Sequence, residues 1–283
     1  MIMRKFFLIA ALFAAMTINA TDLWTGEKHV SWADGGLQIE ASAFADAVAG
    51  QKIVVTFTAA SDGIEFKVLG DFHHLPGSRE GWWISGDGNV ELFLTPAAVT
   101  DLKANGLEII GANFTATKVE LLDGKELKEG ITVWTGFFWA DTWSTLELYK
   151  EAYKSVDFSQ VEAIRFYSEA AGTDYKLNFL KGWGDGEKFA DQGVMTDGVG
   201  YKELALTDEL RTAIAEAGHW MVQFNKEGLD PFNVTDIVLV PKKETPTSIS
   251  RTSLESKAVK MIENGQVVII REGVRFNALG VRM

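Results

Sequence analysis

An internal repeat is the feature of this sequence that most constrains its fold. Residues 23–26, Leu-Trp-Thr-Gly, return as Val-Trp-Thr-Gly at residues 133–136. Further parallels keep the same order and an offset of about 110 residues: 52–57 with 162–167, 64–72 with 175–183, and 117–121 with 235–239. A repeat of this length is the size of one β-sandwich rather than of one solenoid repeat. The sequence therefore predicts two copies of one all-β module, an arrangement more typical of binding proteins than of enzymes.

The N-terminal segment has the pattern of a secretory signal. Residues 1–20 place Arg4 and Lys5 before the apolar run 6–16 and end in Ile-Asn-Ala, a plausible cleavage site. A single membrane anchor is the alternative, but the run is short for a bilayer span and no longer apolar stretch follows it. The chain has no cysteine, which excludes disulfides and a lipid-bearing N-terminal cysteine. We expect a secreted protein, periplasmic, at the cell surface or extracellular, that is stabilised by burial alone.

The C-terminal segment differs in composition from the repeated part. Residues 242–257 are polar and lack an apolar period, which predicts a linker. Beyond it, β-prone runs flank Asn264-Gly265, a strong hairpin signal, and a third short run follows at 274–280. This tail resembles, in shortened form, the tails of secreted Bacteroidetes proteins, some of which direct type IX export and surface attachment. A small β-hairpin without an export role is the alternative.

Alternating apolar and polar positions predict half-buried strands in the first module. These strands are expected at residues 53–58, 64–69, 90–94, 107–110 and 117–122. Short helical turns are expected at 41–44, at 96–104 behind Thr95 as N-cap, and at 207–217 in the second module. The predicted organisation is a signal peptide at 1–20, sandwich modules at 21–128 and 129–241, a linker at 242–257 and a β tail at 258–283.

The closing motif of the module carries a family resemblance. Gly111-Ala112-Asn113-Phe114 precedes residues 117–121, and its counterpart at 222–225 is degraded and followed by an insertion at 226–232. With the Trp-x-Gly opening and the strand order, the motif resembles galactose-binding-domain-like carbohydrate-binding modules of secreted Bacteroidetes proteins, over residues 22–241. The resemblance implies an all-β fold of two tandem jelly-roll sandwiches, with short helices in the connections and a small C-terminal β-hairpin. It implies the ligand less strongly than the fold, because its motifs are mostly structural.

The charge of the chain excludes some partners. The predicted mature chain has 25 basic and 39 acidic residues, a net charge of −14. The last 42 residues carry eight basic and four acidic side chains, so residues 21–241 have a net charge of −18. Such a surface repels nucleic acid and anionic membranes. Neutral glycans and cations remain compatible partners.

Nine tryptophans supply the candidate binding residues, because sugar rings stack on flat aromatic faces. Trp82 and Trp83 are adjacent, so on a strand one would face the core and the other the solvent; the alternative is that both pack. Arg79 and His73 lie in the same loop-rich stretch. In the second module, Trp183 and Asp185 stand in a turn-rich loop.

Trp32, Trp143 and Trp139 form a second candidate group. The repetition of Trp32 as Trp143 also favours a shared structural role for these two. We expect Trp24, Trp134 and Trp220 to lie in the core.

Metal and catalytic motifs find little support. His73-His74 has no third histidine nearby at ligand spacing, so no zinc site is expected. The acidic residues 185, 187 and 191 leave structural calcium open as a cofactor, but their spacing is not that of an EF-hand and a solvated loop is the simpler interpretation. The chain has no Gly-x-Ser-x-Gly elbow, no His-Glu-x-x-His and no phosphate loop.

The sequence therefore predicts a secreted, non-catalytic protein that binds a polysaccharide or oligosaccharide through exposed tryptophans. A structural or adhesive envelope protein that binds protein partners is the alternative. A polysaccharide-degrading enzyme would need two carboxyl groups facing each other across a groove. The sequence assigns no catalytic residue, no metal ligand, no membrane span and no oligomeric state, and it names no particular glycan.

Overall fold

The computed structural model forms two compact units, Met1–Lys242 and Lys243–Met283. It describes residues 20–61, 63–70, 73–79, 81–141, 144–169, 176–182, 188–190, 196–198, 200–225, 231–242, 259–263, 266–271 and 274–277. The predicted signal peptide, apart from Ala20, and the predicted linker, apart from Lys242, lie outside these ranges.

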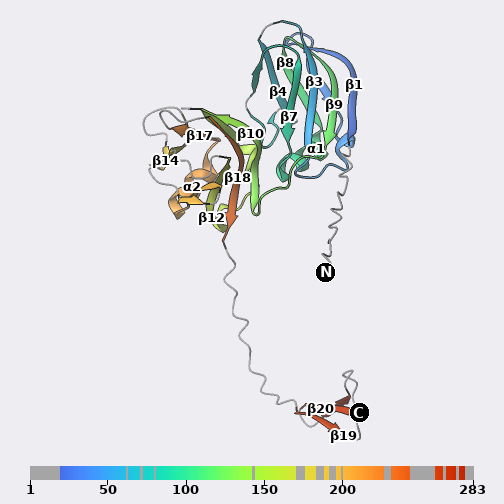
Figure 1. The fold of residues 1–283 in the computed structure, drawn as a ribbon, viewed down its shortest axis with the longest axis vertical. Helices are drawn as coiled ribbons and strands as arrows, with labels where there is room; N and C mark the ends of the chain where they lie inside the picture. Colours follow the sequence, from blue (N-terminus) through green and yellow to red (C-terminus); the bar gives the residue numbers. More distant parts are fainter. Residues whose placement is uncertain are drawn as a thin grey trace, which may run out of the picture. The chain divides into compact units, whose positions relative to one another are not determined.

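Two antiparallel sheets form from the first part of the larger unit (Figure 1). One sheet has the strand order β1-β9-β3-β7, and the other has the order β2-β8-β4, with β5 and β6 both paired to β4. The strands are β1 (Thr21–Val30), β2 (Leu37–Ile39), β3 (Lys52–Ala59), β4 (Ile64–Gly70), β5 (His73–His74), β6 (Trp82–Ile84), β7 (Gly88–Phe93), β8 (Leu107–Ala112) and β9 (Phe114–Leu122).

Two more antiparallel sheets follow, with strand orders β10-β18-β12-β16-β15 and β11-β17-β13-β14. Their strands are β10 (Ile131–Ala140), β11 (Thr145–Tyr149), β12 (Val161–Ser168), β13 (Lys176–Leu180), β14 (Lys188–Ala190), β15 (Thr196–Gly198), β16 (Tyr201–Ala205), β17 (His219–Asn225) and β18 (Phe232–Pro241). We call the first pair of sheets the first sandwich and this pair the second sandwich, since each pair encloses its own cluster of buried apolar side chains.

The repeated Trp-x-Gly motif has the same backbone setting in both sandwiches. β1 pairs with β9, and β10 pairs with β18, with register irregularities at matching positions around Trp24 and Trp134. In each strand the indole ring lies over the glycine two residues later. A Cβ atom at Gly26 would lie 2.9 Å from Cζ2 of Trp24, and one at Gly136 would lie 3.1 Å from Cζ2 of Trp134. The motif therefore requires glycine because the ring occupies the space of a side chain.

The two α-helices begin at matching N-caps. The Thr95 hydroxyl accepts a hydrogen bond from the backbone N–H of Ala98 at 3.1 Å, ahead of α1 (Pro96–Asn105). The Thr207 hydroxyl accepts one from Leu210 at 3.2 Å, ahead of α2 (Asp208–Glu216). Such a cap satisfies one of the four free N–H groups of a helix start. Three short 3₁₀ turns complete the helical elements: η1 (Ala41–Phe44), η2 (Lys150–Ala152) and η3 (Phe158–Gln160).

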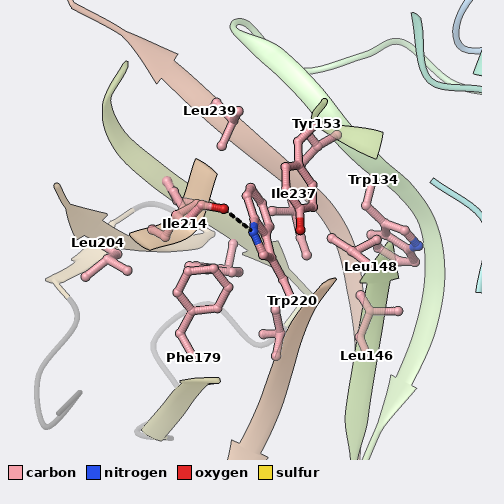
Figure 2. Close-up of a cluster of buried hydrophobic side chains, with 14 of the residues drawn as sticks. Trp134, Leu146, Leu148, Tyr153, Phe179, Leu204, Ile214, Trp220, Ile237 and Leu239 are labelled. Atoms are coloured by element: carbon pink, nitrogen blue, oxygen red, sulfur yellow. Dashed lines mark hydrogen bonds between the residues drawn. The ribbon is translucent and has the colours of Figure 1, made fainter. Parts of the chain in front are cut away.

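Trp220 lies at the centre of the second core (Figure 2). Its ring stacks on Tyr153 with centroids 3.9 Å apart and meets Phe179 edge to face at 5.5 Å. The indole N–H donates a hydrogen bond to the carbonyl of Ile214, near the end of α2, at 3.2 Å. The polar atom of this fully buried side chain is therefore satisfied, as burial of an indole requires.

Lys125 joins the segment after β9 to the second sandwich. Its ammonium donates hydrogen bonds to the carbonyls of Thr235 at 2.6 Å and Gly136 at 3.2 Å, and it lies 3.2 Å from the buried carboxylate of Asp236. The Thr135 hydroxyl donates to the same carboxylate oxygen at 2.8 Å. Burial lowers the pKa of Lys125, an effect that Asp236 opposes. The lysine thus supplies the opposite charge that a buried carboxylate needs.

The smaller unit contains a three-stranded antiparallel sheet of β19 (Val259–Glu263), β20 (Gln266–Arg271) and β21 (Val274–Asn277). In this sheet Glu263 pairs with Gln266, and Arg271 pairs with Val274. Val268 is its buried apolar side chain among the described residues.

The predicted all-β class is confirmed. The structure has antiparallel sheets throughout, the expected helices near 96–104 and 207–217, and a helical turn at 41–44. The ends of the expected strands differ by one to three residues from those observed: β9 begins three residues earlier, at Phe114, and β7 ends one residue earlier, at Phe93. Among the residues that the structure describes, no helix is long and apolar enough to cross a membrane. The module boundaries at 128 and 241 stay predictions.

Replacing Trp220 tests how far the second core depends on one ring. We expect Trp220→Ala to lower the free energy of unfolding by about 3–5 kcal/mol, because it leaves a large cavity. Urea unfolding followed by circular dichroism measures the change. Trp139→Ala, which truncates an exposed tryptophan, is the comparison, and equal stability of the two variants would contradict the central role of Trp220.

Replacing Lys125 tests the buried charge pair. We expect Lys125→Met to lower the free energy of unfolding by about 1–3 kcal/mol, because Asp236 loses its charged partner. Lys128→Met removes a charge from an exposed position of the same segment and should change stability by less than about 0.5 kcal/mol. Adding Asp236→Asn to Lys125→Met should recover part of the loss. An unchanged denaturation midpoint in Lys125→Met would show that the pair does not stabilise the fold.

Candidate functional site

The outward face of the β2-β8-β4 sheet carries the candidate site. Along β4, Ile64, Phe66 and Val68 are buried, so Glu65 and Lys67 point to the opposite face. β6 continues this sheet at its edge, with Trp82 opposite Phe66 and Trp83 opposite Glu65. The pairing register therefore directs Trp82 toward the core and Trp83 toward the outward face.

The two adjacent tryptophans have different surroundings. Trp82 packs edge to face on Phe66, with centroids 5.6 Å apart, and borders the first core. The Trp83 side chain is 77% exposed. The structure therefore contradicts the alternative that both rings pack in the core. An indole exposed to this extent costs solvation free energy, which a ligand that covers it would return.

A hollow of about 220 Å³ lies beside Trp83. Its lining comes from both sandwiches: Lys67, Arg79, Gly81 and Trp83 from the first, and Thr145 and Glu147, on β11, from the second. We call it the aromatic hollow. Two cations, a carboxylate, a hydroxyl and one broad indole face converge there. This mixture of groups can orient a polar ligand that has an apolar face.

Lys67 brings a second exposed tryptophan next to the aromatic hollow. Its ammonium lies 3.1 Å from the Glu65 carboxylate and 6.0 Å from the ring centroid of Trp32. The Trp32 side chain is 60% exposed. Repetition in the sequence favoured a structural role for this residue, but the turn at Ser31–Gly35 directs its ring away from the core. Trp32 and Trp83 thus share Lys67 as a neighbour.

Arg79 lies between the two sandwiches. Its guanidinium carbon is 5.9 Å from the ring centroid of Trp82 and 5.1 Å from that of Phe138 on β10. Burial lowers the pKa of Arg79, since water no longer surrounds the whole guanidinium. The two rings attract the cation through their faces and hold it at the wall of the aromatic hollow.

Aromatic rings also pack between the first and the second sandwich. The His74 ring stacks on Tyr149 of β11 at 3.9 Å with an interplanar angle of 4°. Phe93 of β7 meets Phe137 of β10 edge to face at 5.5 Å. The His74–Tyr149 contact holds β11, which carries Thr145 and Glu147, against the first sandwich, and the Phe93–Phe137 contact does the same for β10.

Two other predicted site residues lie outside the aromatic hollow. One ring nitrogen of His73 is 2.8 Å from a carboxylate oxygen of the buried Asp101. This bond joins β5 to α1, which is a structural role. Trp139 is 62% exposed on β10, where it pairs with Asn233. Neither residue is among the six that line the hollow.

The remaining predicted site residues, Trp143, Trp183 and Asp185, lie outside the described residues. The structure also adds residues that the sequence did not single out. Lys67 could have been found from the alternation along β4, which places it on the outward face beside the tryptophan pair. Thr145 and Glu147 carry no such signal, because their position depends on how the second sandwich packs against the first. Within the described ranges, no group of three or more His, Asp or Glu side chains could hold a metal ion.

Comparison with known proteins finds distant structural likenesses. No model of a protein family matches the sequence, and no curated protein has a significantly similar one. SGBP-B of the Bacteroides ovatus mixed-linkage glucan utilization locus, solved in complex with a mixed-linkage heptasaccharide, has 18% identity and a TM-score of 0.33, over 36% of this chain and 30% of that chain. The M60 catalytic domain of Clostridium perfringens ZmpB with its CBM51-1 and CBM51-2 domains has 8% identity and a TM-score of 0.18, over 78% of this chain and 38% of that chain. Similarities at this level do not establish a shared ligand or activity.

The adjacent tryptophans give a direct test of the site geometry. We expect Trp83→Ala to leave the free energy of unfolding within about 0.5 kcal/mol of the wild type, because its ring packs little. We expect Trp82→Ala to lower it by about 2 kcal/mol or more, since truncation of a fully buried tryptophan costs more still. Chemical denaturation of both variants measures the difference. The reverse order of stabilities would contradict the register of β6.

Proposed function

We propose that the protein is a secreted, non-catalytic glycan-binding protein and that the aromatic hollow is its binding site. The exposed indole of Trp83 beside a hollow with charged and hydroxyl groups is the observation that carries this proposal. A pyranose ring has one face of C–H groups and a rim of hydroxyls. The indole would stack on the first, and Lys67, Arg79, Thr145 and Glu147 would bond to the second.

Trp32 would extend the binding surface beyond one sugar unit. It is exposed and lies against the same Lys67 that lines the hollow. A ligand that covers Trp32 as well as the hollow would be an oligosaccharide or a longer chain, since Trp32 is not among the residues that line the hollow. The tandem arrangement therefore acts, in this proposal, as one composite site and not as two separate sites, one in each sandwich.

The proposed location follows from the ends of the sequence. The signal-like residues 1–20 would direct export, and the mature chain would begin at Thr21. The residues after Lys242 would attach or sort the protein at the cell surface, if they act as the type IX tails that they resemble. A net charge of −18 on residues 21–241 keeps nucleic acid an unsuitable partner.

A second candidate function is contact with a protein partner in the cell envelope. Phe137 and Trp139, two positions apart on β10, are 55% and 62% exposed. Exposed aromatic side chains of this kind are enriched at protein interfaces. Neither residue lines the aromatic hollow, so separate variants distinguish the two functions.

Glycan binding by the mature chain, residues 21–283, tests the proposal. We expect binding on an array of plant, host and bacterial glycans, together with a shift of intrinsic tryptophan fluorescence. Trp83→Ala should weaken binding by roughly tenfold or more, as loss of a central aromatic anchor does. Trp83→Tyr, which keeps a flat ring, should retain more of the affinity.

Trp139→Ala is the matched control variant. It truncates another exposed tryptophan that does not line the aromatic hollow, so we expect it to bind glycan as the wild type does. If Trp139→Ala loses binding and Trp83→Ala retains it, the site assignment is wrong. A blank array, with capture of an envelope protein that Trp139→Ala abolishes, would favour the second candidate function.

A further inference from the structure

Arg79 lies at the wall of the aromatic hollow, and no described residue uses the hydrogen-bonding capacity of its guanidinium. Trp82 and Phe138 contact its guanidinium through their ring faces, which offer no hydrogen-bond acceptor. No hydrogen bond or ion pair joins this guanidinium to any other residue in the described part of the chain. Other half-buried cations do have such partners, as Lys125 has Asp236 and Arg165 has Glu203.

An arginine in this setting favours an anionic ligand group. The guanidinium stays charged in proteins and carries five N–H donors in a planar fork. Burial lowers the pKa of Arg79, because the charged guanidinium loses part of its water. A carboxylate matches the fork with two parallel hydrogen bonds and supplies the missing opposite charge.

The rest of the aromatic hollow limits how many anionic groups can be accommodated. Lys67 is a second cation, but Glu65 lies 3.1 Å from its ammonium and offsets its charge. Glu147 adds a carboxylate to the opposite wall. Residues 21–241 carry a net charge of −18, so a densely charged anionic polymer would be repelled at a distance. One carboxylate fits at Arg79, and the neighbouring units must be neutral.

We propose that the glycan is a polysaccharide with a neutral backbone that carries isolated uronic acid units, whose carboxylate pairs with Arg79 while a sugar ring stacks on Trp83. This inference rests on the proposed function and specifies its ligand class. Lys67, Thr145 and Glu147 then bond to hydroxyls of the neutral units. The selectivity for sparsely acidic over densely acidic glycans comes from the Arg79 guanidinium, which has no hydrogen-bond or ion-pair partner among the described residues, in a chain of net negative charge.

Matched pairs of polysaccharides test the ligand class on the wild-type chain, residues 21–283. Glucuronoxylan and gum arabic are each compared with their carboxyl-reduced forms, with polygalacturonate as the dense polyanion and mixed-linkage β-glucan as a neutral polymer. We expect a native polymer with sparse acid groups to bind roughly ten- to a hundredfold more tightly than its reduced form, the range for a charge-assisted hydrogen-bonded pair. Polygalacturonate should bind more weakly than the sparsely acidic polymer.

Variants locate the preference at Arg79. Arg79→Lys keeps the positive charge and loses the planar fork, so it should lose most of the advantage of the native polymer over its reduced form. Lys103→Gln, at an exposed position in the last turn of α1, removes one positive charge outside the hollow and should keep that advantage. Thermal unfolding of each variant shows whether it is folded, and the wild-type comparison of native with reduced polymer does not depend on any variant.

The outcomes separate this inference from the proposed function. The uronic acid proposal is wrong if native and reduced polymers bind equally, or if only neutral or only densely acidic glycans bind. If Trp83 is still required in that case, the proposed glycan binding stands. Binding to none of the polymers and to no glycan on the array would overturn both. A preference for the native polymer that survives Arg79→Lys unchanged would place the acid group elsewhere and overturn the role of Arg79.

Discussion

Packing of aromatic rings against one another is the interaction on which the rest of this structure depends. The chain has no cysteine, so nothing covalent holds the sheets together. In the first sandwich Phe57, Phe66 and Phe114 meet within 5.4–6.3 Å, and in the second Trp220 is enclosed by Tyr153, Phe158 and Phe179. The same kind of contact joins the sandwiches, through the His74–Tyr149 stack and the Phe93–Phe137 pair. An aromatic side chain buries a large apolar area, and it loses little conformational entropy on burial because it has only two side-chain torsions. Such rings can therefore stabilise the sandwiches without cross-links.

The sequence carried enough information to predict the fold class, the helices and part of the site. The period of two along residues 64–69 predicted β4, and adjacency predicted that Trp82 and Trp83 would face opposite sides of a strand. Trp134 and Trp220 lie in the core as predicted, and Trp24 packs against it partly buried. The repeat was a poor guide to Trp32, which is exposed. A residue that recurs in a repeated motif can be buried or exposed, so its recurrence alone does not predict its burial. His73 stays a predicted ligand-binding residue, and its contact with Asp101, 28 residues away, is one that only the folded chain brings about.

The composite nature of the aromatic hollow lies beyond what a local pattern can predict. Each strand pattern describes one sheet, whereas Thr145 and Glu147 reach the hollow only because the second sandwich packs on the first. Arg79 illustrates the same point: it contacts Trp82 three positions away in sequence and Phe138 almost sixty positions away.

The shared walls of the aromatic hollow have a thermodynamic consequence. A ligand that contacts Arg79 and Glu147 at once binds only when both sandwiches are folded and docked. By linkage, its binding free energy is added to the stability of that docked state and to neither sandwich alone. A bound ligand would thus make the unfolding of the two sandwiches, which have separate cores, more cooperative. In an extracellular setting, where proteases sample local opening, such coupling would protect the loaded protein more than the empty one.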